Sequence, residues 1–204
     1  MSNEIPNIIP NRKFWKKLFD EWKHVLQLYI DKVDDLPYWH RERANTGFLA
    51  EACWRIGAVV VEEYWTQRKG RRGKSKVGSC DLFVKHKDLD FFVEAKQLWP
   101  AAPVDERNLE NVEYSLKEAY EQLVDNHYTR KRQYLVAICY IAPMLSIIEE
   151  KKFNSKLYLN MLRERYKDEI IIPFFPDIDP KRIYGKDKHK YPGVVLIARV
   201  RKRK

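Results

Sequence analysis

Three charged residues, Asp81, Glu94 and Lys96, stand at the ends of two short apolar runs. Carboxylate oxygens are the ligands that Mg²⁺ takes in proteins, where the ion keeps several waters and binds substrate phosphates. A cation held by Asp81 and Glu94 could polarise a phosphodiester and lower the pKa of a bound water. Lys96 could orient that water or neutralise charge developing on the phosphate, and the backbone carbonyl of Ala95 could add a ligand.

The stretch 78–97 predicts a β-hairpin, because two short apolar runs are joined by a polar turn. Side chains alternate across a strand, so Glu94 and Lys96 point to the same face. A hairpin of this length can bring Asp81 near that pair. The sequence therefore predicts two carboxylates and one ammonium at one end of the hairpin.

Further helices and strands are expected around this hairpin. Apolar residues at three- and four-residue steps predict helices at 12–33, 46–56, 105–125 and 143–166. Asn45 or Thr46 can cap the second of these helices. Apolar runs rich in β-branched and aromatic residues predict strands at 58–65, 133–141 and 193–200. Helices interleaved with strands predict an α/β fold with a mixed central sheet flanked by helices.

The 204 residues are enough for one domain with its own core, and we expect a single domain over 1–204. Its core would span about 45–141. A helical extension would occupy 1–44, and a last helix, an irregular segment and a last strand would occupy 142–204.

The composition gives a net charge of +10, which favours a polyanionic partner such as nucleic acid. The apolar runs are too short to cross a bilayer, and the first residues lack a hydrophobic signal core, so we expect a cytoplasmic protein without a membrane partner. Three scattered cysteines, Cys53, Cys80 and Cys139, are expected to be buried thiols rather than a disulfide or zinc framework.

A basic loop precedes the hairpin and could contact phosphate. Its alternative is a solvated turn without a partner. Six of the nine residues from 68 to 76 are basic: Arg68, Lys69, Arg71, Arg72, Lys74 and Lys76.

Asp81 and the run ending in Glu94-Ala95-Lys96 resemble the core motif of the PD-(D/E)XK nuclease superfamily, which has a restriction-endonuclease-like fold. The resemblance covers about 45–141 and implies Mg²⁺-dependent hydrolysis of DNA phosphodiesters, with Mn²⁺ able to substitute. It assigns Asp81 and Glu94 as metal-binding acids and Lys96 as the motif lysine.

The resemblance also implies two assisting residues and leaves alternatives open. Glu51 would be the acid supplied by the helix before the first strand, and Gln97 the polar residue after the lysine. Cys80 replaces the proline of the motif name, and Asn126 stands where the Gln-x-x-x-Tyr signature of one exonuclease subgroup has tyrosine. An endonuclease is therefore expected, and cutting both strands would suit a homodimer. The alternatives are a junction-resolving nuclease, a non-catalytic nucleic-acid-binding module, and an enzyme or effector without a nucleic-acid partner.

Overall fold

The computed structural model of the chain describes residues 5–69, 75–101, 105–127, 133–150, 153–176 and 189–203. The helices of this part are α1 (Arg12–Val33), η1 (Pro37–Trp39), α2 (Glu42–Arg55), α3 (Glu106–Asp125), α4 (Ile147–Glu150) and α5 (Ser155–Arg165). The strands are β1 (Val59–Lys69), β2 (Ser75–His86), β3 (Leu89–Leu98), β4 (Asn126–His127), β5 (Gln133–Ile141), β6 (Ile170–Phe174) and β7 (Val194–Lys202). None of the helices in these ranges is long and apolar enough to span a membrane.

The strands form one seven-stranded mixed sheet in the order β4-β1-β2-β3-β5-β7-β6. β3 and β5 are parallel, and the other neighbours are antiparallel. Parallel neighbours need a crossover connection, which α3 provides by packing on both strands. The expectation of an α/β fold with a mixed sheet flanked by helices is confirmed.

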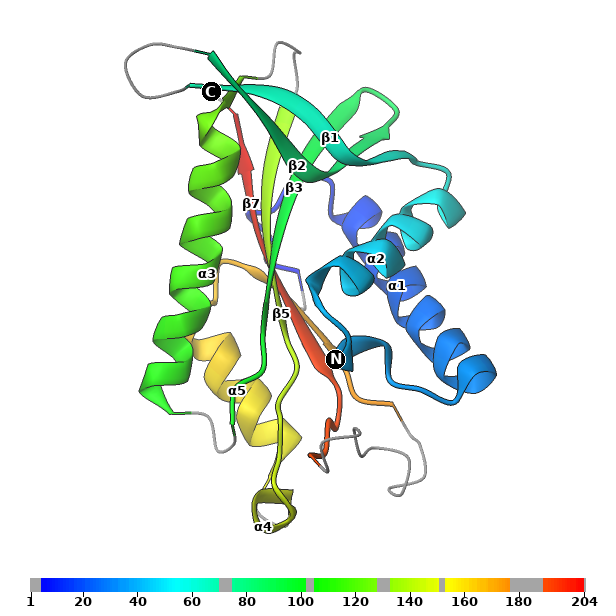
Figure 1. The fold of residues 1–204 in the computed structure, drawn as a ribbon, viewed down its shortest axis with the longest axis vertical. Coiled ribbons are helices and arrows are strands. Elements are labelled where there is room, and N and C mark those ends of the chain that lie inside the picture. The colour runs from blue at the N-terminus through cyan, green and yellow to red at the C-terminus, as the bar shows by residue number, and fades with distance from the viewer. Residues whose placement is uncertain are drawn as a thin grey trace.

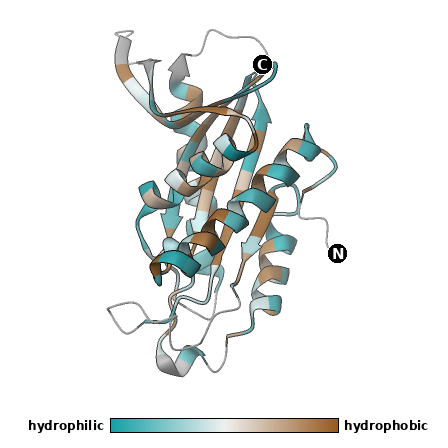
Figure 2. Ribbon diagram, turned by 90° about the vertical axis from the view of Figure 1, so that its right-hand side faces the viewer, coloured by the Kyte–Doolittle hydropathy of each residue, from teal (hydrophilic) through white to brown (hydrophobic). Residues whose placement is uncertain are grey.

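Helices cover the sheet on both faces (Figure 1), with α1 and α2 on one side and α3 and α5 on the other. Hydrophobic residues colour the strands of the sheet and parts of the helices, and hydrophilic residues colour much of the remaining helix surface (Figure 2). All nine residues of β5 are buried, as predicted for a strand covered on both faces. Cys53, Cys80 and Cys139 are buried free thiols, as expected.

The predicted hairpin is present, with β2 and β3 paired from Leu82–Val93 to His86–Leu89. The helix 12–33 and the strand 133–141 are found at their predicted bounds. Local apolar patterns specify these elements: three- and four-residue steps in the helix and an uninterrupted apolar run in the strand.

Three expectations about elements are wrong. The helix 143–166 is two helices, since Asn154 caps a new helix by accepting from the backbone N–H groups of Lys156 and Leu157. The irregular segment contains β6, which tolerates Pro173 because β6 is the edge strand of the sheet. The second helix begins at Glu42 rather than at position 46, which changes the site.

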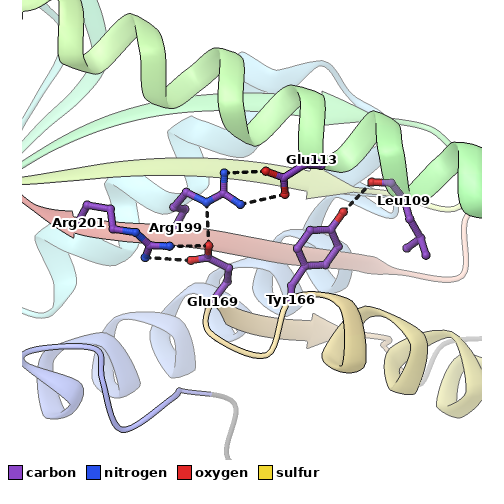
Figure 3. Close-up of polar contacts among 6 residues, drawn as sticks. All are labelled: Leu109, Glu113, Tyr166, Glu169, Arg199 and Arg201. Atoms are coloured by element: carbon purple, nitrogen blue, oxygen red, sulfur yellow. Dashed lines mark hydrogen bonds and ion pairs between the residues drawn. The ribbon is translucent and has the colours of Figure 1, made fainter.

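An ion-pair network joins the helical layer on the α3 side to the sheet (Figure 3). The Arg199 guanidinium on β7 bonds Glu113 on α3 at 2.9 and 3.1 Å, and Glu169, just before β6, at 2.7 Å. Arg201 also donates to Glu169, at 2.8 and 3.3 Å. The network therefore connects segments that lie far apart in the sequence.

Candidate active site

The candidate site lies where β2 and β3 separate. Their pairing ends at Leu82–Val93, but β3 continues to Leu98 beside β5. β2 follows β1 instead, and Glu63 on β1 has a positive φ of 50°. Backbone groups of β3 beyond Val93 are thereby left on an edge that β2 no longer pairs.

Asp81 binds this open edge of β3. Its Oδ2 accepts a hydrogen bond from the backbone N–H of Ala95 at 2.7 Å. A charged acceptor makes this a short, strong bond, which holds the half-buried carboxylate against the strand. Because the N–H and C=O of one residue in a strand point to the same side, the Ala95 carbonyl is directed to this edge as well.

Glu94 and Lys96 lie on the face of β3 that is covered by α3. The Lys96 Nζ is 3.8 Å from the Glu94 Oε1, and the Lys96 side chain is 21% exposed whereas that of Glu94 is 8% exposed. Lys96 Nζ also donates to Gln122 Oε1 at 3.5 Å, and Gln122 Nε2 donates to Glu118 Oε1 at 3.3 Å. One turn of α3 therefore helps to orient the ammonium.

Glu42, at the first position of α2, is the residue that the sequence interpretation missed. Burial raises the pKa of Glu42 above its ordinary value, and the negative charges of Asp81 and Glu118 add to this. The positive charge of Lys96 and the backbone N–H of Gln97 act in the opposite direction. The Glu42 carboxyl group therefore lies within electrostatic reach of Lys96 and Asp81. We call Glu42, Asp81, Glu94 and Lys96 the carboxylate–lysine cluster.

Glu51, which was expected to assist, is not among the residues that the structure brings to this cluster. It follows Glu42 by nine residues on α2, which is about 13.5 Å along the axis and half a turn around it. Its half-exposed side chain accepts from Arg55 Nε at 2.8 Å and lines a surface groove beside α1. Glu42 lies one turn before the buried residues of α2 and on the same face. That face would have indicated Glu42 rather than Glu51.

The expected cap residues explain why this buried face was cut short. Asn45 is fully buried inside α2, and its Nδ2 donates to Gln97 Oε1 at 2.8 Å and to the His40 carbonyl at 3.3 Å. Arg41 occupies the N-cap position without a side-chain cap. Asparagine suits both a helix cap and a buried hydrogen-bonding position, and only the tertiary contacts distinguish the two.

The Gln97 side chain hydrogen-bonds the start of α2 and the segment before it, rather than a residue of the carboxylate–lysine cluster. Its Nε2 donates to the carbonyls of Tyr38 at 3.0 Å and His40 at 2.9 Å. With the bond from Asn45, the Gln97 amide holds the segment that leads into α2. Because Glu42 begins that helix, Gln97 fixes the distance between Glu42 and β3.

The predicted phosphate contacts cannot be placed. Residues 70–74, which include Arg71, Arg72 and Lys74, lie outside the described residues, as do the side chains of Arg68, Lys69 and Lys76. The backbone of β1 and β2 reaches the two ends of this loop.

Within the described ranges, no group of three or more His, Cys, Asp and Glu side chains is arranged so that it could hold a metal ion by itself. Mg²⁺ requires fewer protein ligands, since it takes one or two carboxylates and keeps waters. Asp81, Glu94 and the Ala95 carbonyl supply only oxygen donors. The chemistry of this donor set fits Mg²⁺ or Mn²⁺ better than zinc.

No family model, curated protein or solved structure matches the chain. A function must therefore be argued from the site itself.

Proposed function

We propose that the protein is a metal-dependent nuclease that hydrolyses DNA phosphodiester bonds within strands, at the carboxylate–lysine cluster. The observation that carries this proposal is that Asp81 bonds the open edge of β3 at Ala95, between Glu94 and Lys96, which lie 3.8 Å apart. Glu42 interacts electrostatically with Asp81 and Lys96. Two carboxylates and a carbonyl would supply the few protein ligands that a Mg²⁺ ion takes.

The element order around the cluster supports the same proposal. Apart from the two-residue strand β4 between α3 and β5, helix α2, three antiparallel strands, helix α3 and the parallel strand β5 follow one another as the PD-(D/E)XK resemblance implies. Glu42 occupies the role that the resemblance gave to Glu51, an acid from the helix before the first strand. Cys80, which replaces the proline of the motif, is buried and bonds the Leu82 carbonyl.

Asp81, Glu94 and the Ala95 carbonyl would hold the ion. When bound, Mg²⁺ would supply Lewis-acid activation of the phosphate and of a water. The Lys96 ammonium, oriented by Gln122, would donate to a phosphate oxygen on which negative charge develops. Glu42 would add a negative charge within electrostatic reach of Lys96. The net charge of +10 would favour the DNA polyanion.

Metal-dependent cleavage tests this proposal. Purified protein is incubated with linear, circular, branched and single-stranded DNA, and with RNA, in Mg²⁺, Mn²⁺ or EDTA. We expect cleavage only with metal, and a loss of at least about 100-fold in Asp81→Asn, because a misplaced metal removes several kcal/mol of transition-state stabilisation.

Glu51→Gln is the matched control, since it removes a carboxylate from the same helix as Glu42 but on the opposite face. We expect it to cut DNA at the wild-type rate, whereas Glu42→Gln is impaired. Cleavage by Asp81→Asn at the wild-type rate would contradict the proposal. Salt-sensitive binding of DNA without any cleavage would favour a non-catalytic binding module.

A further inference from the structure

A second pocket opens beside the cluster, at the end of β3. It has a volume of about 510 Å³ and is walled by Trp39, Trp99, Met144 and Tyr191, with His40 and Arg41 at its rim. This volume lies within the range of about 300–1,000 Å³ that small-molecule pockets occupy. We call it the aromatic pocket.

The walls of the aromatic pocket are fixed by the fold. The backbone N–H groups of Ala142 and Met144 donate to the carbonyls of Leu98 and Pro100, each at 3.0 Å, so the chain after β5 is held beside Trp99. On the other side, the buried Tyr38 hydroxyl donates to the Tyr191 carbonyl at 3.2 Å. The pocket is therefore preformed.

Aromatic rings define its interior. The rings of Trp39 and Tyr191 meet edge to face, with centroids 5.6 Å apart. Trp99 is 38% exposed, and no aromatic ring of the described residues packs against its indole. A large exposed indole at a rigid position offers a stacking surface for a flat partner.

The aromatic pocket and the cluster share two chain segments. Trp99 follows Lys96 by three residues, and Arg41 directly precedes Glu42. Both features therefore lie where β3 ends and α2 begins. The exposed Arg41 offers a cation for a phosphate of a bound DNA strand.

We propose that the aromatic pocket receives an unpaired nucleobase of the DNA strand bound at the cluster, with the base stacked on Trp99. Every base has a flat π face, so this contact is tolerant of sequence. A base inside a duplex is already stacked on its neighbours, and so the pocket selects single-stranded or branched DNA. This inference rests on the proposed function, because it gives that site a substrate class.

Binding measured in EDTA tests the inference without any cleavage. The probes are a labelled oligothymidylate, an abasic strand of the same length and a blunt duplex, followed by fluorescence anisotropy. We expect Trp99→Ala to weaken oligothymidylate binding roughly 5- to 150-fold, the range expected for loss of one base stack. Trp99→Phe, which keeps a ring, should retain most of the affinity.

The controls separate stacking from general effects. Trp54→Ala removes another exposed tryptophan, at the far end of α2, and should bind like the wild type. Trp99→Ala should not alter binding of the abasic strand or the duplex. Equal loss on all three probes, or no loss on oligothymidylate, would overturn the inference.

The two proposals fail in different ways. Asp81→Asn should keep its oligothymidylate affinity, because the aromatic pocket does not contain Asp81. A Trp99 effect on binding in a protein that cuts nothing would refute the nuclease but keep the pocket. Cleavage that is lost in Asp81→Asn but indifferent to Trp99, with unchanged binding by Trp99→Ala, would keep the nuclease and refute the pocket.

Discussion

The surroundings of Glu42 disfavour the ionised form of its carboxyl group. Burial and the neighbouring carboxylates Asp81 and Glu118 raise its pKa above the ordinary 4.5, although Lys96 and the Gln97 N–H act against this. A raised pKa in the folded state means that the ionised side chain costs folding free energy at neutral pH. Such a cost is typical of residues that are kept for binding or catalysis rather than for stability.

Replacing Glu42 should therefore stabilise the protein. The folded-state pKa lies above the unfolded one, so the stability associated with protonated Glu42 is full below about pH 4.5 and is lost as the pH rises through the folded pKa. Glu42→Gln mimics the protonated form. In EDTA at neutral pH its Tm should exceed that of the wild type, and the difference should shrink toward zero below pH 4.5.

The control is again Glu51→Gln, which loses an exposed ion pair with Arg55. Its Tm should be equal to or slightly below that of the wild type at neutral pH, since such pairs contribute about 0.3–0.5 kcal/mol. A lower Tm for Glu42→Gln at neutral pH would show that its carboxylate is stabilising and would refute this account.

At the scale of elements, Gln97 connects β3 to α2. One amide group satisfies the carbonyls of Tyr38 and His40 and the amide of Asn45. Three hydrogen bonds from one side chain hold the start of α2 in a single position, which positions Glu42 over the open edge of β3. The site therefore depends on a side chain that does not point into it.

Gln97→Ala should loosen this connection. The Tyr38 carbonyl loses its Gln97 donor and Asn45 loses its Gln97 acceptor, although Asn45 still donates to the His40 carbonyl. We expect a loss of about 1–3 kcal/mol in the free energy of unfolding, measured with urea. The concentration of Mg²⁺ that gives half-maximal cleavage should also rise, which a purely structural loss would not cause.

Gln27→Ala provides the comparison, because Gln27 on α1 makes only an exposed hydrogen bond to Asp31. It should change neither the unfolding free energy beyond about 0.5 kcal/mol nor the Mg²⁺ requirement. If Gln97→Ala behaves like Gln27→Ala, the Gln97 amide does not position α2.

At the scale of the whole molecule, the network of Figure 3 holds the layers together. Burial alone would lower the pKa of Arg199, but its hydrogen bonds to Glu113 and Glu169 outweigh burial and raise it. Arg199 therefore stays charged inside the fold. Tyr166 adds a further link by donating to the Leu109 carbonyl at 2.6 Å.

Removing one member of this network should destabilise the whole fold. Glu169 is 5% exposed and serves both Arg199 and Arg201, so Glu169→Gln should lower the free energy of unfolding by about 3 kcal/mol. Glu121→Gln, which removes an exposed pair with Lys117, should cost less than about 0.5 kcal/mol. Similar losses in urea for the two variants would contradict the assigned role of Glu169.

Patterns local in sequence predicted much of the fold. The apolar runs at 82–84 and 91–93, joined by a polar turn, specify the hairpin, and the uninterrupted apolar run at 133–141 specifies a central strand. β6 was not predicted because Pro173 argues against a strand. An edge strand tolerates proline, and only the order of the strands in the sheet shows that β6 lies at an edge. The split of 143–166 was missed because Asn154 lies inside an otherwise helical pattern.

The sequence by itself predicted that Asp81, Glu94 and Lys96 lie near one end of the hairpin, because strand alternation and hairpin length fix their faces and separation. Only the tertiary structure decided that Glu42, and not Glu51, interacts electrostatically with Asp81 and Lys96. The physical reason is that both glutamates suit a helix equally well, whereas β3 and Gln97 determine which end of α2 meets the sheet. The aromatic pocket was decided in the same way, since Trp39, Trp99, Met144 and Tyr191 come from four separate segments that only the packed sheet brings together.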